Sequence, residues 1–185
     1  MKFLPIIALC LSLIGCGSGG NYYVLATSGK APSGGGYGIG IGPVTVADYL
    51  SERPYLIFQS TPTKMEVSDE HQWAGDLASN FSRTLGTDLG YHLGTGNIRQ
   101  YPWRSDKELR YQITVDVNQF HGTADGEALL EASWRVYALP AGRLVASSTS
   151  TLREPLQADG FEKLAEAQSR LVDQLAKEIA ARLEK

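Results

Sequence analysis

Cysteine thiols are the most reactive side chains in this sequence, and both of them lie close to its start. Cys10 and Cys16 fall within the first sixteen of the 185 residues. A thiolate can form a disulfide, ligate a metal or carry a covalent group. Because the rest of the chain has no cysteine, neither a disulfide framework nor a cysteine-based metal site can hold it together. Covalent modification near the N-terminus is the chemistry that this arrangement favours.

Motifs of the common enzyme classes are missing from the sequence. It contains no G-x-S-x-G nucleophile elbow and no P-loop, and the glycines at 38, 40 and 42 do not fit the G-x-G-x-x-G dinucleotide pattern. The three histidines lack metal-binding spacing, so we expect them on the surface. His71 and His92 are expected near the two ends of one helix, and His121 near a turn. We therefore expect a protein that is not an enzyme and holds no metal or other cofactor.

The residues around Cys16 resemble the lipobox of bacterial lipoproteins. Leu13-Ile14-Gly15-Cys16 places a branched apolar residue and a small residue ahead of the cysteine. Met1-Lys2 and the apolar run from Phe3 to Ile14 precede it, as in a secretory signal, and this run is shorter than the roughly 20 residues of a membrane-spanning helix. The resemblance implies that residues 1–15 are a signal peptide. The alternative is an ordinary secreted protein whose cysteine happens to fall near the cleavage site.

Lipid attachment would turn the N-terminus into a membrane anchor. In bacterial lipoproteins the cysteine, here Cys16, carries an S-diacylglyceryl group and an N-acyl chain such as palmitate, and two or three chains hold far more firmly than one. Cys10 is then discarded, residues 16–20 form the lipidated cysteine and a short Gly/Ser tether, and the domain occupies residues 21–185. Gly17, rather than Asp, follows the cysteine, which by the enterobacterial sorting rule implies the periplasmic side of the outer membrane.

Composition is consistent with one folded domain that does not bind nucleic acid. Apolar residues make up 43% of the chain, which is enough for a core. The 17 basic and 20 acidic residues give a net charge of −3, and removal of Lys2 with the signal peptide would change it to −4. This balance gives no electrostatic reason to expect nucleic-acid binding.

Glycine is concentrated in the first part of the domain. We expect a strand over residues 21–26, a flexible loop over 27–36 and a second strand over 37–46. In the second strand, glycine alternates with isoleucine between Gly38 and Gly42, so one face carries no side chains. Such a face either allows close approach of another backbone or a partner, or belongs to a bulged edge strand.

Hydrophobic periodicity predicts the other elements. A four-residue repeat predicts a helix over 70–93, and a longer amphipathic pattern predicts a second helix over 159–185, with Gln168 in its apolar seam. Alternating residues predict three consecutive strands, in which the alternation changes phase at Phe120. These strands are expected over 111–120, 130–138 and 144–152, and shorter ones over 55–59, 64–67 and 98–101.

Together these elements predict an α+β fold in a single domain. We expect a mixed, mainly antiparallel sheet with a C-terminal three-strand meander, packed by two long amphipathic helices. Trp73, Phe81 and Trp134 are expected in the core. Trp103 follows Pro102 and precedes a charged loop, so it is the best candidate for an exposed aromatic contact.

Several short motifs follow the lipobox in a fixed order, and the most specific are Gly42-Pro43-Val44, Tyr49-Leu50, Arg53-Pro54 and Tyr101-Pro102-Trp103. These ordered motifs resemble the ABC-type transport auxiliary lipoprotein family, the group of PqiC (YmbA) proteins that are membrane integrity-associated transporter subunits. The resemblance covers nearly the whole chain after the lipobox. Ala47 replaces a frequent proline of the family, and Ser51-Glu52 separates Tyr49-Leu50 from Arg53-Pro54.

Membership in this family implies a subunit of an MCE-type, Pqi-like intermembrane lipid transport system. The lipoprotein would dock a PqiB-like MCE-domain protein at the outer membrane, support envelope integrity and assemble as a homo-oligomer, with a ring as one form. Tyr37, Tyr49 and Trp103 are the candidate partner contacts. Two other functions stay open: a periplasmic lipid carrier, or a lipoprotein that regulates a cell-wall enzyme.

Overall fold

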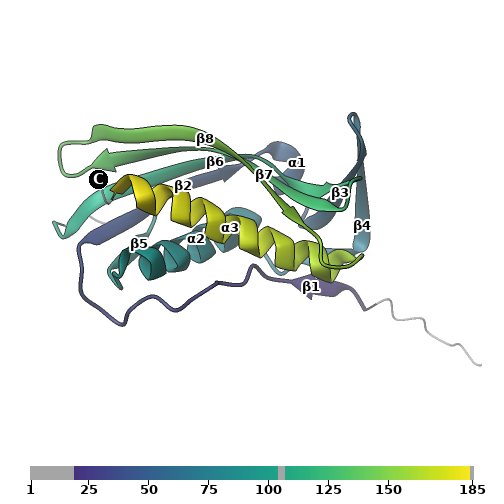
Figure 1. Cartoon of the computed structure of the whole chain (residues 1–185), viewed down its shortest axis with the longest axis horizontal. Helices are drawn as coiled ribbons and strands as arrows, with labels where there is room; N and C mark the ends of the chain where they lie inside the picture. Colours follow the sequence, from purple (N-terminus) through teal and green to yellow (C-terminus); the bar gives the residue numbers. More distant parts are fainter. Residues whose placement is uncertain (1–18, 104–106, 184–185) are drawn as a thin grey trace, which may run out of the picture.

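A mixed β-sheet with both long helices on one of its faces forms the domain (Figure 1). The computed structural model describes residues 19–103 and 107–183. The predicted signal peptide 1–15, with Cys10, and the predicted anchor Cys16 lie outside the described residues. The elements, in chain order, are β1 (Asn21–Tyr23), β2 (Gly38–Val46), α1 (Asp48–Ser51), β3 (Tyr55–Thr61), β4 (Lys64–Trp73), α2 (Leu77–Leu93), β5 (Ile98–Gln100), β6 (Leu109–Thr123), β7 (Glu127–Ala138), β8 (Arg143–Pro155) and α3 (Phe161–Leu183).

Strand β6 organises the sheet because it pairs along both of its edges. On one side it runs parallel to β2 and then, beyond the end of β2, to β3. On the other side it pairs antiparallel with β7, which pairs antiparallel with β8. Strand β5 lies outside β2, while β4 and then β1 lie outside β3. The longest pairings are thus antiparallel, and the predicted fold class and C-terminal meander are confirmed.

The meander forms where apolar and polar residues alternate. Ile113, Val115 and Val117 of β6 are buried, and the residues between them are at least partly exposed. The pairing of β6 with β7 shifts between Val117 and Gln119. This bulge confirms the predicted change of phase, since it returns the ring of Phe120 to the buried face.

Helix α2 begins at Leu77, so the predicted start near residue 70 is wrong. Strand β4 continues to Trp73, and Gly75 turns the chain at a φ of 103°. Asp76 then caps the helix, since its Oδ1 accepts a hydrogen bond from the backbone N–H of Ser79 at 2.7 Å. Trp73 stands four residues before Leu77, which extended the apparent helical repeat across this turn.

The core fills the space between the sheet and the two helices. Trp73, Phe81 and Trp134 are each at most 2% exposed, as predicted. Phe120 connects two of these side chains, because its ring stacks on that of Trp73 at 6.2 Å and meets the ring of Phe81 edge-on at 5.6 Å. Helix α3 packs against α2 and across β6, β7 and β8. Gln168 of α3 is buried among these apolar residues.

The segment between β1 and β2, residues 24–37, runs along the helix layer as an N-terminal strap (Figure 1). Its backbone N–H groups at Ala26 and Ser28 donate hydrogen bonds to Ser169 Oγ of α3 and to Asp88 Oδ1 of α2, at 3.0 and 2.9 Å. The strap therefore joins both helices to the segment that leads back to the N-terminus.

Candidate functional site

A groove of about 420 Å³ lies where the first turns of α2 approach β5 and the beginning of the β2 bulge. We call it the motif groove, because Gly42-Pro43-Val44 and Tyr101, from the two tripeptides that carry the family resemblance, form its walls. It is lined by Gly42, Pro43, Val44, Asp76, Ala78, Ser79, Ser82, Arg83, Gln100 and Tyr101.

Next to this groove, Trp103 covers the glycine face of β2. The backbone N–H of Tyr101 donates to the carbonyl of Ile41 at 2.9 Å, and the following peptide bond to Pro102 is cis. The indole of Trp103 then lies so close to the sheet that a Cβ at Gly40 would be 2.6 Å from its ring. The glycine face is thus closely approached, but at Gly40 the approaching group is the side chain of the chain's own half-buried Trp103 and not another backbone or a partner.

Strand β2 is bulged, but it is not an edge strand. It pairs with β6 on one side and with β5 on the other. The bulge falls between Ile41 and Val44, and Gly42 has a φ of 118°, a conformation that side-chain-bearing residues rarely adopt. The glycine therefore permits both the bulge and the approach of Tyr101, whose Cβ would lie 2.7 Å from a Cβ at this position.

Hydrogen bonds fix the walls of the motif groove to one another. Ser82 Oγ donates to Gln100 Oε1 at 2.5 Å, and Gln100 Nε2 donates to the Ser82 carbonyl at 3.3 Å. On the opposite face of β2, Gln112 Nε2 donates to the Gly42 carbonyl at 2.9 Å. Tyr101 stands at the rim with 56% of its surface exposed. The groove thus combines a fixed backbone with an exposed aromatic side chain, which suits recognition of a protein partner.

The structure does not bring the three predicted contact residues together. Tyr37 precedes β2, where its ring meets Tyr111 edge-on at 5.6 Å and Arg110 lies over it. Tyr49 lies in α1, beyond the other end of β2, and its hydroxyl accepts a hydrogen bond from the Phe120 N–H at 3.4 Å. Burial raises the pKa of the Tyr49 hydroxyl above its ordinary value. Among the three, Trp103 is the residue next to the motif groove.

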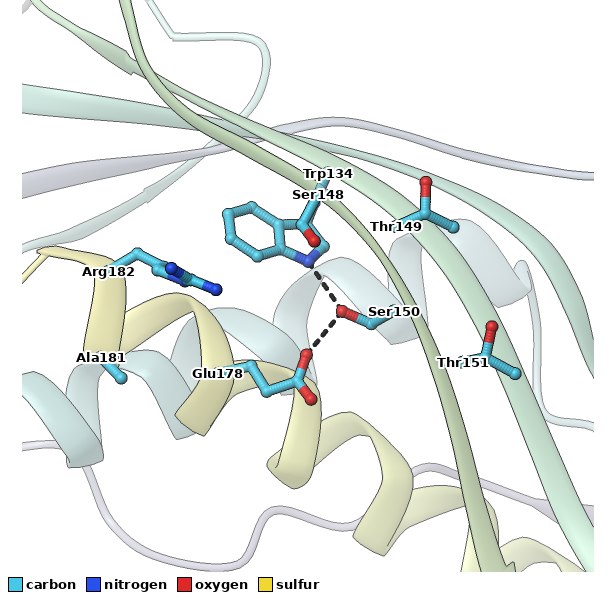
Figure 2. A pocket seen from close by; sticks show the side chains of 8 residues that line it. All are labelled: Trp134, Ser148, Thr149, Ser150, Thr151, Glu178, Ala181 and Arg182. Atoms are coloured by element: carbon cyan, nitrogen blue, oxygen red, sulfur yellow. Dashed lines mark hydrogen bonds between the residues drawn. The ribbon is translucent and has the colours of Figure 1, made fainter.

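A second opening, of about 530 Å³, lies between β8 and the end of α3, and we call it the hydroxyl-lined hollow (Figure 2). The indole Nε1 of Trp134 donates to Ser150 Oγ at 3.0 Å, and Ser150 Oγ donates to Glu178 Oε2 at 2.5 Å. This chain of hydrogen bonds satisfies the buried indole N–H. The other lining residues are Ser148, Thr149, Thr151, Ala181 and Arg182.

The histidines occupy different environments from those the sequence suggested. His121 is fully buried, which lowers the pKa of its imidazole. His71 lies in β4, not in a helix, and its ring stacks between those of Tyr23 and Phe161. His92 is near the end of α2 and contacts Asp173 at 2.8 Å. Surface placement was therefore wrong for His121, and helical placement was wrong for His71.

Asp88 of α2 is a buried carboxylate outside both openings. Its Oδ1 accepts the hydrogen bond from Ser28 of the strap, and its Oδ2 has no hydrogen-bond partner. Burial, with a smaller contribution from the nearby carboxylate of Asp173, raises the pKa of Asp88 to about 6. Hydrogen bonding to the strap and the neighbouring His92 oppose this shift. The group is thus a titratable contact between α2 and the strap.

Within residues 19–103 and 107–183, no group of three or more His, Cys, Asp or Glu side chains could hold a metal ion. In the same residues, none of the helices combines the length and the apolar character needed to cross a membrane.

Comparison with known proteins identifies the family. The family model of the ABC-type transport auxiliary lipoprotein component matches residues 23–180. The chain belongs to this family. A search of curated proteins found no match.

Two solved structures share the fold of this family member. An uncharacterized protein matches with a TM-score of 0.72 at 20% sequence identity, over 88% of this chain and 97% of its own. Protein XCC0632 from Xanthomonas campestris, described as a DUF330 family member, matches with a TM-score of 0.67 at 17% identity, over 86% of this chain and 92% of its own. At these identities the similarity shows the fold alone.

Several residues that complete the motif groove could not be recognised from sequence patterns. Ser79, Ser82 and Arg83 belong to the α2 turns that the sequence predicted as part of a longer helix, and Gln100 ends β5. A signal was available only for the cap, because an aspartate directly before an apolar periodic run, here Asp76 before Leu77, is typical of a helix start. Ser82 and Gln100 face each other only because α2 packs against β5.

Proposed function

We propose that this protein is the lipid-anchored subunit of an MCE-type, Pqi-like intermembrane lipid transport system, and that it docks the transporter on the periplasmic side of the outer membrane. The family is that of an auxiliary lipoprotein of ABC-type transport, which implies a transporter as partner. The motif groove carries the proposal, since Gly42-Pro43-Val44 and Tyr101, which belong to the family resemblance, meet in it. Trp103, from the same tripeptide as Tyr101, lies next to the groove. The role is docking rather than catalysis.

The packing of the core favours docking over lipid carriage. A carrier needs an apolar cavity large enough for an acyl chain. Here the space between the sheet and the helices is occupied by side chains, with Phe81, Phe120 and Trp134 almost fully buried there. The motif groove and the hydroxyl-lined hollow are both open at the surface and partly polar.

Homo-oligomeric assembly, for example as a ring, is also part of the proposal. Strand β8 is 13 residues long, and within the described residues only one of its edges pairs with another strand, β7. An unpaired strand edge offers backbone donors and acceptors to a second chain. This edge is therefore the surface from which we expect copies to associate.

Site-specific photo-crosslinking in cells that produce the whole transport system tests the docking role. A photoreactive amino acid at Tyr101 should yield an adduct that contains the MCE-domain protein. Leu144, which is 50% exposed in β8 and lies outside both openings, is the matched control and should not yield that adduct. A cell-wall enzyme in the Tyr101 adduct, or an MCE adduct of equal strength from both positions, would contradict the proposal.

The anchor is tested separately. Cys16→Ala should abolish acylation and leave the domain folded but mislocalised, because the domain that we expect to fold occupies residues 21–185, after the cysteine. Mass spectrometry of the N-terminal peptide and fractionation of the envelope would check both results. Continued presence of the unacylated variant in the outer membrane would show that protein contacts alone hold it there.

A further inference from the structure

The extended segment formed by β1 and the start of the strap exposes two apolar side chains on one side. Tyr22 and Val24 are 66% and 60% exposed, more than any other large apolar residue that the structure describes. They alternate with Tyr23 and Leu25, which face the domain. The hydroxyl of Tyr23 is 2.7 Å from His71 Nδ1, and Leu25 is buried in the core. The inward residues thus fix the segment, and the outward pair has no packing role.

These side chains follow closely after the predicted anchor. Tyr22 is six positions and Val24 eight positions after Cys16, which limits their distance from the cysteine to about 21 and 28 Å in a fully extended chain. By contrast, the exposed apolar residues Leu144 and Val145 lie at the start of β8, at the other end of the molecule from β1 (Figure 1). The most exposed apolar pair is therefore the one that the tether holds nearest to the lipid.

We infer that Tyr22 and Val24 contact the surface of the bilayer in which the Cys16 lipid is inserted. This inference rests on the lipid anchor of the proposed function. Tyrosine suits the boundary between headgroups and acyl chains, since its ring is apolar and its hydroxyl is polar. The opposing residue in β4 is the uncharged Gln72, which pairs with Tyr22, and the nearby charged residues of that strand, Asp69 and Glu70, are acidic. We therefore expect contact with an uncharged or zwitterionic lipid surface.

The tether makes even a weak contact effective. A short flexible linker gives an effective concentration in the millimolar range, so a surface with millimolar affinity is occupied for a large part of the time. The strap continues from Val24 and is bonded to α2 and α3 through Asp88 and Ser169. Contact at β1 therefore orients the whole domain, including the motif groove, relative to the membrane.

Quenching of a fluorescent label on the full-length, acylated protein tests the inference. The mature chain has no free thiol when Cys16 is acylated and Cys10 is removed with the signal peptide, so Val24→Cys and Leu144→Cys each provide one labelling site. Each labelled protein is reconstituted into phosphatidylcholine vesicles that contain a nitroxide-headgroup phosphatidylcholine. We expect quenching at position 24 to be at least threefold stronger than at position 144.

The outcomes separate the inference from the proposed function. Equal, weak quenching at both positions, in proteins that float with the vesicles, would overturn the membrane contact and leave the anchor intact. Failure of the acylated protein to float would overturn both. Because the label replaces Val24, a second variant is needed: Tyr22→Ser in the Val24-labelled protein should reduce quenching at least twofold, whereas Val145→Ser should not change it.

Discussion

The motif groove and the hydroxyl-lined hollow are similar in size, about 420 and 530 Å³, but they are built in different ways. The groove depends on backbone geometry, through the bulge at Gly42 and the indole that covers Gly40. The hollow depends on side chains of β8 and α3 that bond to one another, as in the chain from Trp134 to Glu178. Volume alone therefore does not identify a docking site. Whether backbone geometry or side chains shape the opening is more informative.

The largest expected effect is that of Gly42→Ala in the groove. The substitution forces an L residue to a φ of 118° and places its Cβ 2.7 Å from that of Tyr101. We expect the free energy of unfolding to fall by about 3 kcal/mol. Gly142→Ala is the matched control, because Gly142 has a φ of 65° and open space around it, so its cost should be about 1 kcal/mol. Urea denaturation of both variants measures the difference, and equal losses would show that the groove is not fixed by its backbone.

The conformation of Gly42 illustrates what the sequence could and could not predict about the fold. Alternating glycines pointed to close approach on one face of β2, and alternating apolar residues predicted β6, β7 and β8. The partner of the glycine face could not be predicted, since Trp103 is more than sixty residues away from Gly40 along the chain. Only the start of α2 was predicted too early, and for a local reason, namely the capping turn at Gly75-Asp76.

The next largest effect is expected from a substitution at Asp88 of α2, the helix whose first turns form the groove. This substitution should change stability without changing docking. Asp88 has a pKa of about 6 in the folded protein, above the ordinary value of 3.8. The folded state thus binds more protons than the unfolded state between these values, so stability falls as the pH rises from about 4 to about 6 and stays lower above that. Asp88→Asn removes this slope, which corresponds to about 3 kcal/mol at pH 7 for a shift of about two pKa units. It also replaces the carboxylate that accepts the Ser28 hydrogen bond by a weaker neutral acceptor, so we expect a net stabilisation of about 1.5 kcal/mol.

Denaturation curves of wild type and Asp88→Asn at pH 4 to 8 would measure the change. The two proteins should be similar at pH 4 and diverge above pH 5, and binding of the transporter should be unaffected because Asp88 lies outside the groove. Parallel pH dependences would show that Asp88 is not the buried titrating group.

A smaller effect is expected in the hollow. Ser150→Ala removes the acceptor of the Trp134 indole N–H and the donor to Glu178. Loss of a partner for a buried donor costs about 1 kcal/mol at an opening that water can reach. Ser82→Ala in the groove should cost less than about 0.5 kcal/mol, since Ser82 and Gln100 are solvent-accessible. Thermal unfolding of both variants checks the order, and the reverse order would contradict a structural role for the hollow.

The candidate site was harder to predict than the fold. Tyr101-Pro102-Trp103 was singled out by the family resemblance, but Trp103 was expected as an exposed contact, and the structure shows it half-buried against Gly40. The burial of His121 was not predictable from its neighbours, because it follows from the bulge before Phe120 and from the pairing of β3 with the end of β6. Features set by contacts between distant strands leave no local pattern in the sequence.

The motif groove, and not the hydroxyl-lined hollow, is the surface that we propose docks the transporter. Ser79 and Ser148 are exposed serines that line the groove and the hollow, respectively, so Ser79→Arg and Ser148→Arg each fill one opening with little effect on folding. The direct measurement is the affinity of each purified variant for the MCE-domain protein. We predict that Ser79→Arg weakens binding at least tenfold, equivalent to about 1.4 kcal/mol, and that Ser148→Arg leaves it unchanged. Weaker binding by Ser148→Arg, with Ser79→Arg equal to wild type, would contradict the claim.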